Sequence, residues 1–230
     1  MKRTLTALLL CSAVFAFAGA NFKLSFAEKK FAPQARSKTI VSKIAIADDN
    51  FIPIPGNKFA FVLSDKNAAA KVAPVYSAAV NFPFAAGSAE VTFKVIKREE
   101  KSQIRMIHVF APAQKNDPQA LLIYYMYIDN KGNGRTGIQV GNKQFLIQIP
   151  AKDFKPDAFN TIKLVWNTDS LSAFLNGKSV EERALPPAFA KAAAAPRGWS
   201  TIAITPVYKG TGDNWNNRMA IASIDIKDAK

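Results

Sequence analysis

The stretch VWNTDSLSAFLNGKSV, at Val165–Val180, alternates apolar and polar residues but is interrupted twice. Alternation with a period of two is typical of a β-strand that buries one face. The first interruption, Asn167-Thr168-Asp169, is a short polar turn. The second, Asn176-Gly177, suits a tight turn because both residues tolerate positive φ. The stretch therefore predicts two antiparallel strands, with a turn at each break.

Strand-like runs with the same alternation recur along most of the chain, separated by Asn, Gly and Pro. Short strands at near-regular spacing are typical of an all-β sandwich or barrel. One short helix is expected at Pro186–Pro196, which prolines bound on both sides. Leu121–Asp129 is apolar on both faces, so we expect a central strand that is covered. The residues that alternation predicts to face the core are Val91, Phe93, Val95, Phe145, Ile147, Ile149, Ile162, Leu164 and Trp166.

The chain begins with the pattern of a secretory signal peptide. Lys2 and Arg3 precede an apolar core, Leu5–Phe17, and the small residues Ala18-Gly19-Ala20 follow. This apolar run is too short for a transmembrane helix, and its flanks favour a peptide that is cleaved. Residues 1–20 are therefore predicted to be removed. The mature protein is expected to be secreted, or to lie in the periplasm or cell envelope.

The mature chain is expected to hold two regions. Residues 21–38 are basic, weakly periodic and interrupted by a proline, so we interpret them as an N-terminal strap. Residues 39–230 carry the strand pattern and are long enough for one large β-sandwich domain. The single cysteine, Cys11, leaves with the signal peptide, so neither disulfides nor thiol chemistry is expected.

The chain is strongly basic, because 31 Lys and Arg face 17 Asp and Glu, a formal net charge of +14. A basic secreted domain is attracted to polyanions such as acidic polysaccharides. The charges are scattered and form no block, a pattern that also serves plain solubility. The net charge is compatible with an acidic polysaccharide as a partner, and we expect no nucleic-acid partner.

The opening hairpin also carries a family resemblance. Phe159–Trp166 ends in tryptophan and turns back into Leu171–Lys178, which closes with Asn-Gly-Lys. This pattern resembles the concanavalin A-like jelly rolls, particularly the laminin-G-like and related sugar-binding domains. Ile221–Ile226 is similar to the closing strand of that family, which pairs near the N-terminus. The resemblance implies a two-sheet antiparallel jelly-roll sandwich and a role in carbohydrate binding.

Two kinds of enzyme on this fold can be compared with the sequence. Family 16 glucanases place their carboxylates on one strand as Glu-x-Asp-x-(x)-Glu, a pattern that is absent here. Glu99-Glu100 and Glu181-Glu182 are adjacent pairs, whose members face opposite ways. Alginate lyases show Gln-Ile-His on one strand and a tyrosine-rich strand, and this chain offers Gln103–His108 and Tyr124–Tyr127. Alternation places the histidine opposite the first residue of its run, so we interpret it as a core residue.

Two segments carry oxygen donors of the kind that calcium prefers. Asp129–Gly134 is similar to a calcium loop, but Lys131 stands at a ligand position, so a hairpin turn is the favoured interpretation. Asp213 and Asn214, beside Trp215, could bind calcium or sugar hydroxyls. The sequence holds no His and Cys set for zinc, and no cofactor is expected.

The sugar-binding hypothesis places a site on one sheet. Tyr125 and Tyr127 share a strand face, where aromatic rings and polar groups could form a groove. Trp215, with Asp213 and Asn214, is an alternative platform in the late loops. The residues expected beside the two tyrosines on neighbouring strands are Arg105, Gln148, Lys163 and Lys94.

Three functions follow from these patterns. The leading hypothesis is a secreted, non-enzymatic carbohydrate-binding module that favours anionic glycans. The second is a polysaccharide lyase, which would need a Tyr or His together with a cation in an open groove. The third is a structural protein of the cell envelope, which would need a flat apolar patch for protein contacts.

Overall fold

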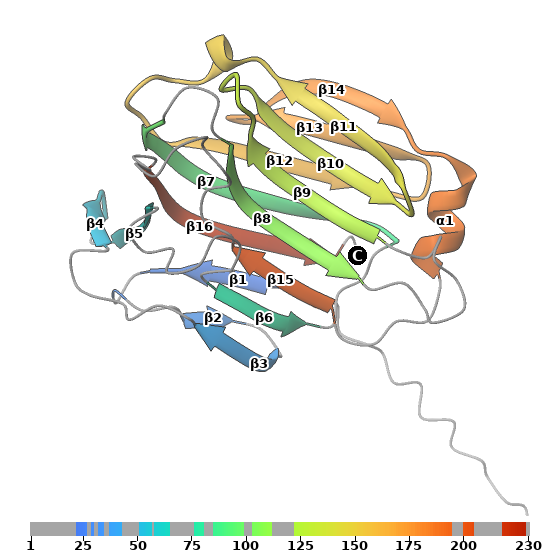
Figure 1. Ribbon diagram of the computed structural model, residues 1–230, viewed down its shortest axis with the longest axis horizontal. Coiled ribbons are helices and arrows are strands. Elements are labelled where there is room, and N and C mark those ends of the chain that lie inside the picture. Colours follow the sequence, from blue (N-terminus) through green and yellow to red (C-terminus); the bar gives the residue numbers. More distant parts are fainter. Residues whose placement is uncertain are drawn as a thin grey trace, which may run out of the picture.

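The structure is a computed structural model of the chain. It shows two layers of β-sheet with a helix at one side (Figure 1). The predicted signal peptide and the segment with Asp213, Asn214 and Trp215 lie outside the described residues. The described residues are 22–26, 29, 32–34, 37–42, 51–56, 58–64, 76–80, 85–98, 103–111, 122–194, 200–204 and 218–228.

Nine described strands form one antiparallel sheet and seven form the other, which confirms the predicted all-β sandwich. The nine-stranded sheet contains β1 (Phe22–Ser25), β2 (Ala32–Gln34), β4 (Phe51–Ile54), β5 (Lys58–Ser64), β7 (Gly87–Lys97), β12 (Asn160–Trp166), β13 (Ser170–Leu175), β14 (Lys178–Ala184) and β16 (Arg218–Asp228). The seven-stranded sheet contains β3 (Ser37–Ser42), β6 (Tyr76–Val80), β8 (Ile104–Ala111), β9 (Leu122–Ile128), β10 (Gly134–Val140), β11 (Lys143–Ile149) and β15 (Ser200–Ile204).

The strand order mixes segments that are far apart in the sequence. The nine-stranded sheet runs β14-β13-β12-β7-β16-β1-β2, with β5 also paired to β16 and β4 to β5. The seven-stranded sheet runs β11-β10-β9-β8-β15-β6-β3. The helices among the described residues are α1 (Pro187–Ala194), within the predicted helical segment, and the 3₁₀-helix η4 (Ala151–Asp153) after β11.

The opening hairpin is formed by β12 and β13, as predicted. Asn167 organises the first turn, because its Oδ1 accepts hydrogen bonds from two backbone N–H groups of the turn, at 2.8 and 2.7 Å. At the second turn Asn176 and Gly177 both have positive φ, 51° and 79°. The Oδ1 of Asn176 also accepts a hydrogen bond from the backbone N–H of Thr161, at 2.9 Å. Each turn is therefore fixed by an asparagine side chain.

The core lies between the two sheets and follows the predicted alternation. Trp166 of β12 packs on Tyr124 of β9, with ring centroids 4.5 Å apart. α1 contributes Phe189, which is fully buried. Two predicted core residues, Val95 and Phe145, are only partly buried and pack against the core. The predictions confirmed as buried are Val91, Phe93, Ile147, Ile149, Ile162, Leu164 and Trp166.

The predicted N-terminal strap begins as a strand of the sandwich. β1 lies between β16 and β2, and Phe22 pairs with Ile226. Phe22, Leu24 and Phe26 are all buried in the main core. Each such burial contributes about 1.5–3 kcal/mol, so this part of the strap is held firmly on the domain. Phe22, Leu24 and Phe26 therefore belong to the core of the sandwich.

Alternation of apolar residues in the sequence does not reveal β10 and β14, two strands that matter for the architecture. β10 contains Gly134 and Gly137, which weaken a strand pattern because they have no side chain to pack. β14 is an edge strand with few buried positions, so it shows no alternation of apolar residues. Because β10 lies between β9 and β11, the residues that flank β9 differ from those that the sequence indicates.

Gly137 is predicted to be indispensable in β10. Its φ is +156°, and an added Cβ would lie 2.1 Å from the carbonyl oxygen of Phe145. We expect Gly137→Ala to lower the free energy of unfolding by about 4 kcal/mol or more, because backbone atoms must move. Gly177→Ala is the matched control: its φ is +79°, but no atom lies within 4 Å of the added Cβ. It should cost only about 1–2 kcal/mol. Urea titration of both variants measures the difference, and equal losses would contradict the steric argument.

Candidate functional site

The candidate site is the outer face of β9–β11, the side of these strands turned away from the core. Residues on this face are those that alternate with buried ones along each strand. In β9, for example, Tyr124, Met126 and Ile128 are buried, so Tyr125 and Tyr127 face outward and are partly exposed. The outer-face residues of the three strands are Tyr125, Tyr127, Arg135, Gly137, Gln139, Gln144, Leu146 and Gln148.

The strand register arranges these residues in rows across the sheet. Arg135 pairs with Tyr127 on one side and with Gln148 on the other. Neighbouring strands are about 4.8 Å apart, so the three side chains of this row are direct neighbours. In the next row Gly137 stands between Tyr125 and Leu146. Gly137 itself is buried, while Tyr125 and Leu146 on either side of it are partly exposed.

Hydrogen bonds link the amide side chains at the other end of the face. The hydroxyl of Tyr125 donates to Oε1 of Gln139. Nε2 of Gln139 donates to the carbonyl oxygen of Gly141 at 2.7 Å, and Nε2 of Gln144 donates to Oε1 of Gln139 at 3.3 Å. The ring of Tyr125 is therefore held in place by its neighbour on β10.

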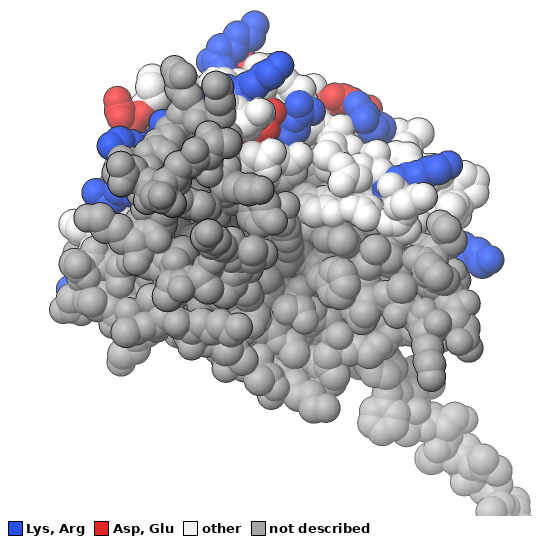
Figure 2. All heavy atoms as spheres, in the orientation of Figure 1, with Lys and Arg blue, Asp and Glu red and all other residues white. Residues whose placement is uncertain are grey.

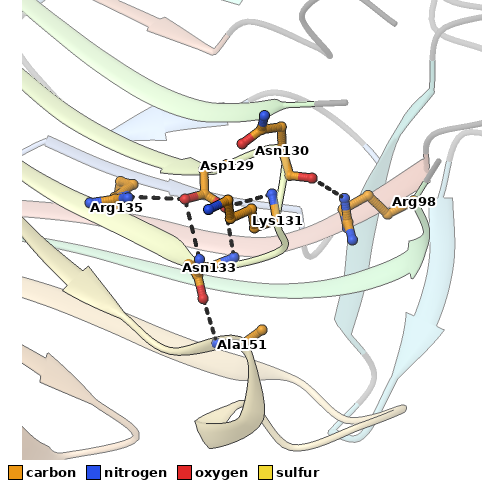
Figure 3. Close-up of polar contacts among 7 residues, drawn as sticks. All are labelled: Arg98, Asp129, Asn130, Lys131, Asn133, Arg135 and Ala151. Carbon is orange, nitrogen blue, oxygen red and sulfur yellow. Dashed lines mark hydrogen bonds and ion pairs between the residues drawn. The ribbon is translucent and has the colours of Figure 1, made fainter. Parts of the chain in front are cut away.

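Asp129, at the end of β9, organises the turn into β10 (Figure 3). Its Oδ1 accepts hydrogen bonds from the backbone N–H groups of Lys131 and Asn133, both at 2.9 Å. Its Oδ2 accepts from Nε of Arg135 at 3.1 Å and from Nδ2 of Asn133 at 3.4 Å. Four protein donors thus occupy a carboxylate that has about four lone-pair positions. The predicted hairpin turn is confirmed.

The turn is also tied to two other elements. Oδ1 of Asn133 accepts a hydrogen bond from the backbone N–H of Ala151 in η4, at 3.0 Å. Nη1 of Arg98, just after β7, donates to the carbonyl oxygen of Asn130 at 3.1 Å (Figure 3). Gly132 has a φ of +86°, and a Cβ there would approach Arg98 Nη2 to 3.2 Å. These contacts make the turn a rigid support for the first residues of β10.

The carboxylate of Asp129 is stabilised in its charged form. Burial by itself would raise the pKa of Asp129, but the hydrogen bonds from Lys131, Asn133 and Arg135 lower it more. The net effect places the pKa of Asp129 below its ordinary value of 3.8. Arg135 is therefore paired with a carboxylate that remains ionised at neutral pH.

Charged side chains of both signs lie around this face. Figure 2 shows basic and acidic residues intermixed along its upper rim, with uncharged groups below them. On this view the described surface carries no single block of positive charge, which agrees with the scattered pattern in the sequence. Among the residues described on this view, the charge density therefore provides no strong attraction to a polyanion.

The structure brings together only part of the predicted site. Gln148 lies on the same face as Tyr125 and Tyr127, but β10 stands between them. The backbone of Arg105 pairs directly with Tyr127, so its register position also belongs to this face; its side chain lies outside the described part. The platform at Asp213, Asn214 and Trp215 also lies outside the described residues.

The placement of Lys94 and Lys163 beside the tyrosines is wrong. Lys94 is on β7 and Lys163 on β12, both in the nine-stranded sheet. Their strand neighbours Phe93, Ile162 and Leu164 are buried, so the two lysines face outward on the opposite side of the sandwich. Alternation within a strand identifies its two faces, but it carries no information on which sheet the strand joins.

His108 stands at a different register position from the one that simple alternation predicts. The pairing of β8 with β9 shifts between Arg105 and Ile107, a β-bulge or irregularity. Ile107 is buried and pairs with the buried Met126, while His108 pairs with Tyr125. Because a bulge changes the parity of a strand, the register positions of Arg105 and His108 belong to the same outer face.

Sequence reasoning did not find Arg135, Gln139 or Gln144 as site residues. Two of them lie on β10, the strand whose glycines hide its alternation. A usable signal was present, because Arg135 is the second residue after the Asp129–Asn133 turn and alternates with Gly134 and Thr136. Recognition of Asp129–Asn133 as a hairpin turn requires a strand on each side of it.

The described residues show neither a metal-binding cluster nor a membrane-spanning helix. Within the described ranges, His, Cys, Asp and Glu do not gather in threes at any place that could hold a metal ion. Among the same residues there is no helix of the length and apolar character needed to cross a membrane.

Asp129→Asn is predicted to destabilise the protein in a pH-dependent way. The pKa of Asp129 is depressed in the folded state, so its contribution to stability is complete above the unfolded-state pKa of about 4 and is lost as the pH falls through the lower folded-state value. We expect a loss of about 1–3 kcal/mol at neutral pH, which shrinks below about pH 4.

Asp169→Asn is the control for this experiment. It removes the same charge from an exposed side chain, at the first turn of the opening hairpin. Thermal unfolding of wild type and both variants between neutral pH and about pH 3 gives the comparison. A stability difference for Asp129→Asn that stays constant across this range would contradict the assigned role of the ionised carboxylate.

Comparison with known proteins shows similarity of fold. The chain superposes on a GlcNAcα1-4Gal-releasing endo-β-galactosidase from Clostridium perfringens with a TM-score of 0.54 and 9% identity, over 77% of this chain and 53% of that one. It superposes on botulinum neurotoxin type C, which interacts with two ganglioside molecules, with a TM-score of 0.60 and 10% identity, over 91% and 48%. An endo-acting O-glycanase of the human gut microbiota gives 0.57 and 9%, over 91% and 99%.

The chain therefore spans about half the length of the first two structures and almost all of the third. No protein-family model and no curated protein sequence matches the chain. At these identities the likeness shows a shared architecture: a two-sheet antiparallel sandwich also present in glycoside hydrolases and in toxin binding domains.

Proposed function

We propose that the protein binds carbohydrate on the outer face of β9–β11 without cleaving it. The observation that carries this proposal is the row of Tyr127, Arg135 and Gln148, with Tyr125 in the adjacent row. Ligand sites commonly combine aromatic surface with a few polar groups that fix orientation. Here two tyrosine rings supply apolar faces, and amide and guanidinium groups supply hydrogen bonds to hydroxyl groups.

Support also comes from other residues of this face and from the fold. Tyr125 and Leu146, which flank Gly137 in the adjacent row, are both partly exposed and add apolar surface to the face. Gln148 is exposed and has no hydrogen-bond partner in the described structure, which leaves its amide available to a ligand. The fold itself is shared with proteins named for their action on glycans or their interaction with gangliosides. A secreted protein with these features would meet glycans outside the cell.

The net charge of +14 adds a non-specific preference. Long-range attraction concentrates acidic glycans near a basic protein, but salt screens this attraction over about 8–10 Å. We therefore expect acidic glycans to bind better at low ionic strength. Only contacts on the outer face should survive at high ionic strength.

The structural-protein hypothesis has less support. A docking surface for a structural partner would be a flat apolar patch. Among the described residues, Ile96 is the one large hydrophobic side chain that is exposed, and it lies at the end of β7 in the other sheet.

Tyr127→Ala should weaken glycan binding by roughly tenfold, the equivalent of about 1.4 kcal/mol, because an apolar ring face is lost. Phe174→Ala is the matched control, since Phe174 is a partly exposed aromatic residue on the outer face of the other sheet. Affinity electrophoresis through a series of neutral and acidic polysaccharides, at low and high salt, gives the comparison. Equal weakening by both variants, or no retardation in any polysaccharide, would overturn the proposal.

A polysaccharide lyase is the second candidate, and the irregularity in β8 favours it. Such an enzyme must neutralise a uronate carboxylate and move a proton, which requires a cation or amide beside a Tyr or His. The register positions of Arg105 and His108 lie across from Tyr127 and Tyr125, so the residue types required stand on one face.

The two candidates differ in one measurable product. Elimination creates an unsaturated sugar that absorbs ultraviolet light, so absorbance is followed while the protein is incubated with alginate and other polyuronates. We expect no increase for the binding module. A steady increase that is abolished in His108→Ala and Tyr125→Phe would replace the binding proposal by the lyase.

A further inference from the structure

We infer that Arg135 selects glycans by binding a carboxylate group, and that Asp129 is the positioning residue that holds Arg135 for this task. The inference rests on the proposed binding of carbohydrate by the outer face of β9–β11, and it names the class of sugar: one that carries a carboxylate, such as a uronic acid. It concerns two residues that meet at the β9–β10 turn (Figure 3).

The carboxylate of Asp129 has no lone-pair position left for a ligand. Its four lone-pair positions are taken by the backbone N–H groups of Lys131 and Asn133, Nδ2 of Asn133 and Nε of Arg135. A neutral sugar hydroxyl that approaches this pair therefore finds no acceptor in the carboxylate. The ion pair presents hydrogen-bond donors only, and donors alone favour a ligand group that is purely an acceptor.

The guanidinium of Arg135 presents the edge formed by its two Nη atoms to a ligand. Its Nε is bound to Asp129 at 3.1 Å, while neither Nη atom has a partner in the described part of the chain. The edge formed by the two Nη atoms matches the two oxygens of a carboxylate, which it can bind through two parallel hydrogen bonds. Both hydrogen bonds to a carboxylate can then form at once in the plane of the guanidinium.

Arg135 is more exposed to solvent than Asp129. The side chain of Arg135 is 30% exposed and that of Asp129 only 8%, so a ligand meets the guanidinium rather than the carboxylate beneath it. Although the pair is formally neutral, two backbone N–H groups and an amide also stabilise the negative charge of Asp129. The exposed end of the pair is therefore its positive end.

The residues on either side of Arg135 in its row can also contact the ligand. Gln148 pairs with it on β11 and can donate a further hydrogen bond to the same carboxylate. Tyr127 pairs with it on β9 and can support the sugar ring that carries the carboxylate. A single uronic acid residue would thus contact all three strands.

The turn at Asp129 holds the guanidinium of Arg135 in one orientation. A fork-shaped contact is selective only if the guanidinium is held in one orientation. The turn that carries Asp129 is tied to η4 through Asn133 and Ala151, and to the end of β7 through Arg98. Arg135 therefore starts from a fixed position and loses little conformational freedom when a ligand binds.

The test compares carboxylated glycans with the same glycans after reduction of their carboxyl groups to alcohols. The probes are oligomers of alginate, polygalacturonate and hyaluronan, each with its reduced counterpart, and dextran sulfate as a sulfated probe. Binding is measured by calorimetry on the mature protein at high salt. We expect at least one carboxylated probe to bind about ten- to a hundredfold more tightly than its reduced form, and the binding of dextran sulfate shows how much of this gain any anionic group can provide.

Three variants distinguish selection from simple loss of charge. Arg135→Gln should bring the ratio between carboxylated and reduced probe close to one, and Arg135→Lys should lower it strongly although it keeps the charge. Asp129→Asn should lower the ratio while binding of the reduced probe is retained. Arg183→Gln is the matched control, because Arg183 is bound by Glu181 in a similar ion pair on β14, in the other sheet. It should leave the ratio unchanged.

Failure of this inference can be told apart from failure of the proposed function. If reduced glycans bind as well as carboxylated ones and Tyr127→Ala still weakens both, the outer face binds sugar but Arg135 does not select a carboxylate. If no probe binds at high salt, the proposed function itself is lost. If Arg135→Gln and Arg183→Gln lower the ratio equally, the effect belongs to net charge and the inference is overturned. Thermal unfolding is measured for every variant, to check that each is folded.

Discussion

The contact of Trp166 with Tyr124 between the two sheets fixes the arrangement on which the site depends. The rings lie 4.5 Å apart, one from β12 and one from β9, and both side chains are almost completely buried. Once Tyr124 faces the core, the two-residue period of a strand forces its neighbours Tyr125 and Tyr127 to face outward. A shift of one residue in β9 would bury the tyrosines that we assign to the site and expose the core. Packing energy therefore specifies the functional face.

The same logic extends across the sheet through the hairpin at Asp129. Because β10 is paired to β9 and β11 without a register shift, one turn determines which residues of three strands share a row. The turn is held by side chains rather than by apolar packing, since Asp129 accepts from the backbone N–H groups of Lys131 and Asn133, and Asn133 accepts from the backbone N–H of Ala151. Burial of a carboxylate is costly without such partners. The hydrogen bonds that make this burial favourable also orient Arg135.

Local patterns in the sequence predicted much of the fold, and long-range pairing accounts for the rest. Alternation identified the buried faces of β7, β11 and β12, and Asn-Gly located a turn, because these depend on neighbours in the chain. It did not separate the faces of β9, which is apolar on both, although Tyr125 and Tyr127 are partly exposed. It failed where a side chain was lacking, in β10, and where a bulge changes parity, in β8. It also placed Lys94 and Lys163 on the wrong side of the sandwich, because the sheet to which a strand belongs is decided by partners distant in sequence.

A basic protein with a donor-only site would recognise a glycan through two effects that act over different distances. The net charge acts over roughly a Debye length and attracts any polyanion, with little regard to its chemistry. The guanidinium edge of Arg135 acts only at hydrogen-bond distance and requires two oxygens in one plane. The first effect raises the rate of encounter, and the second determines which encounters persist. Because the acidic and basic side chains around this face are intermixed, discrimination between glycans must arise from the short-range contacts. Selectivity of this kind depends on the rigid turn at Asp129 more than on the number of lysines.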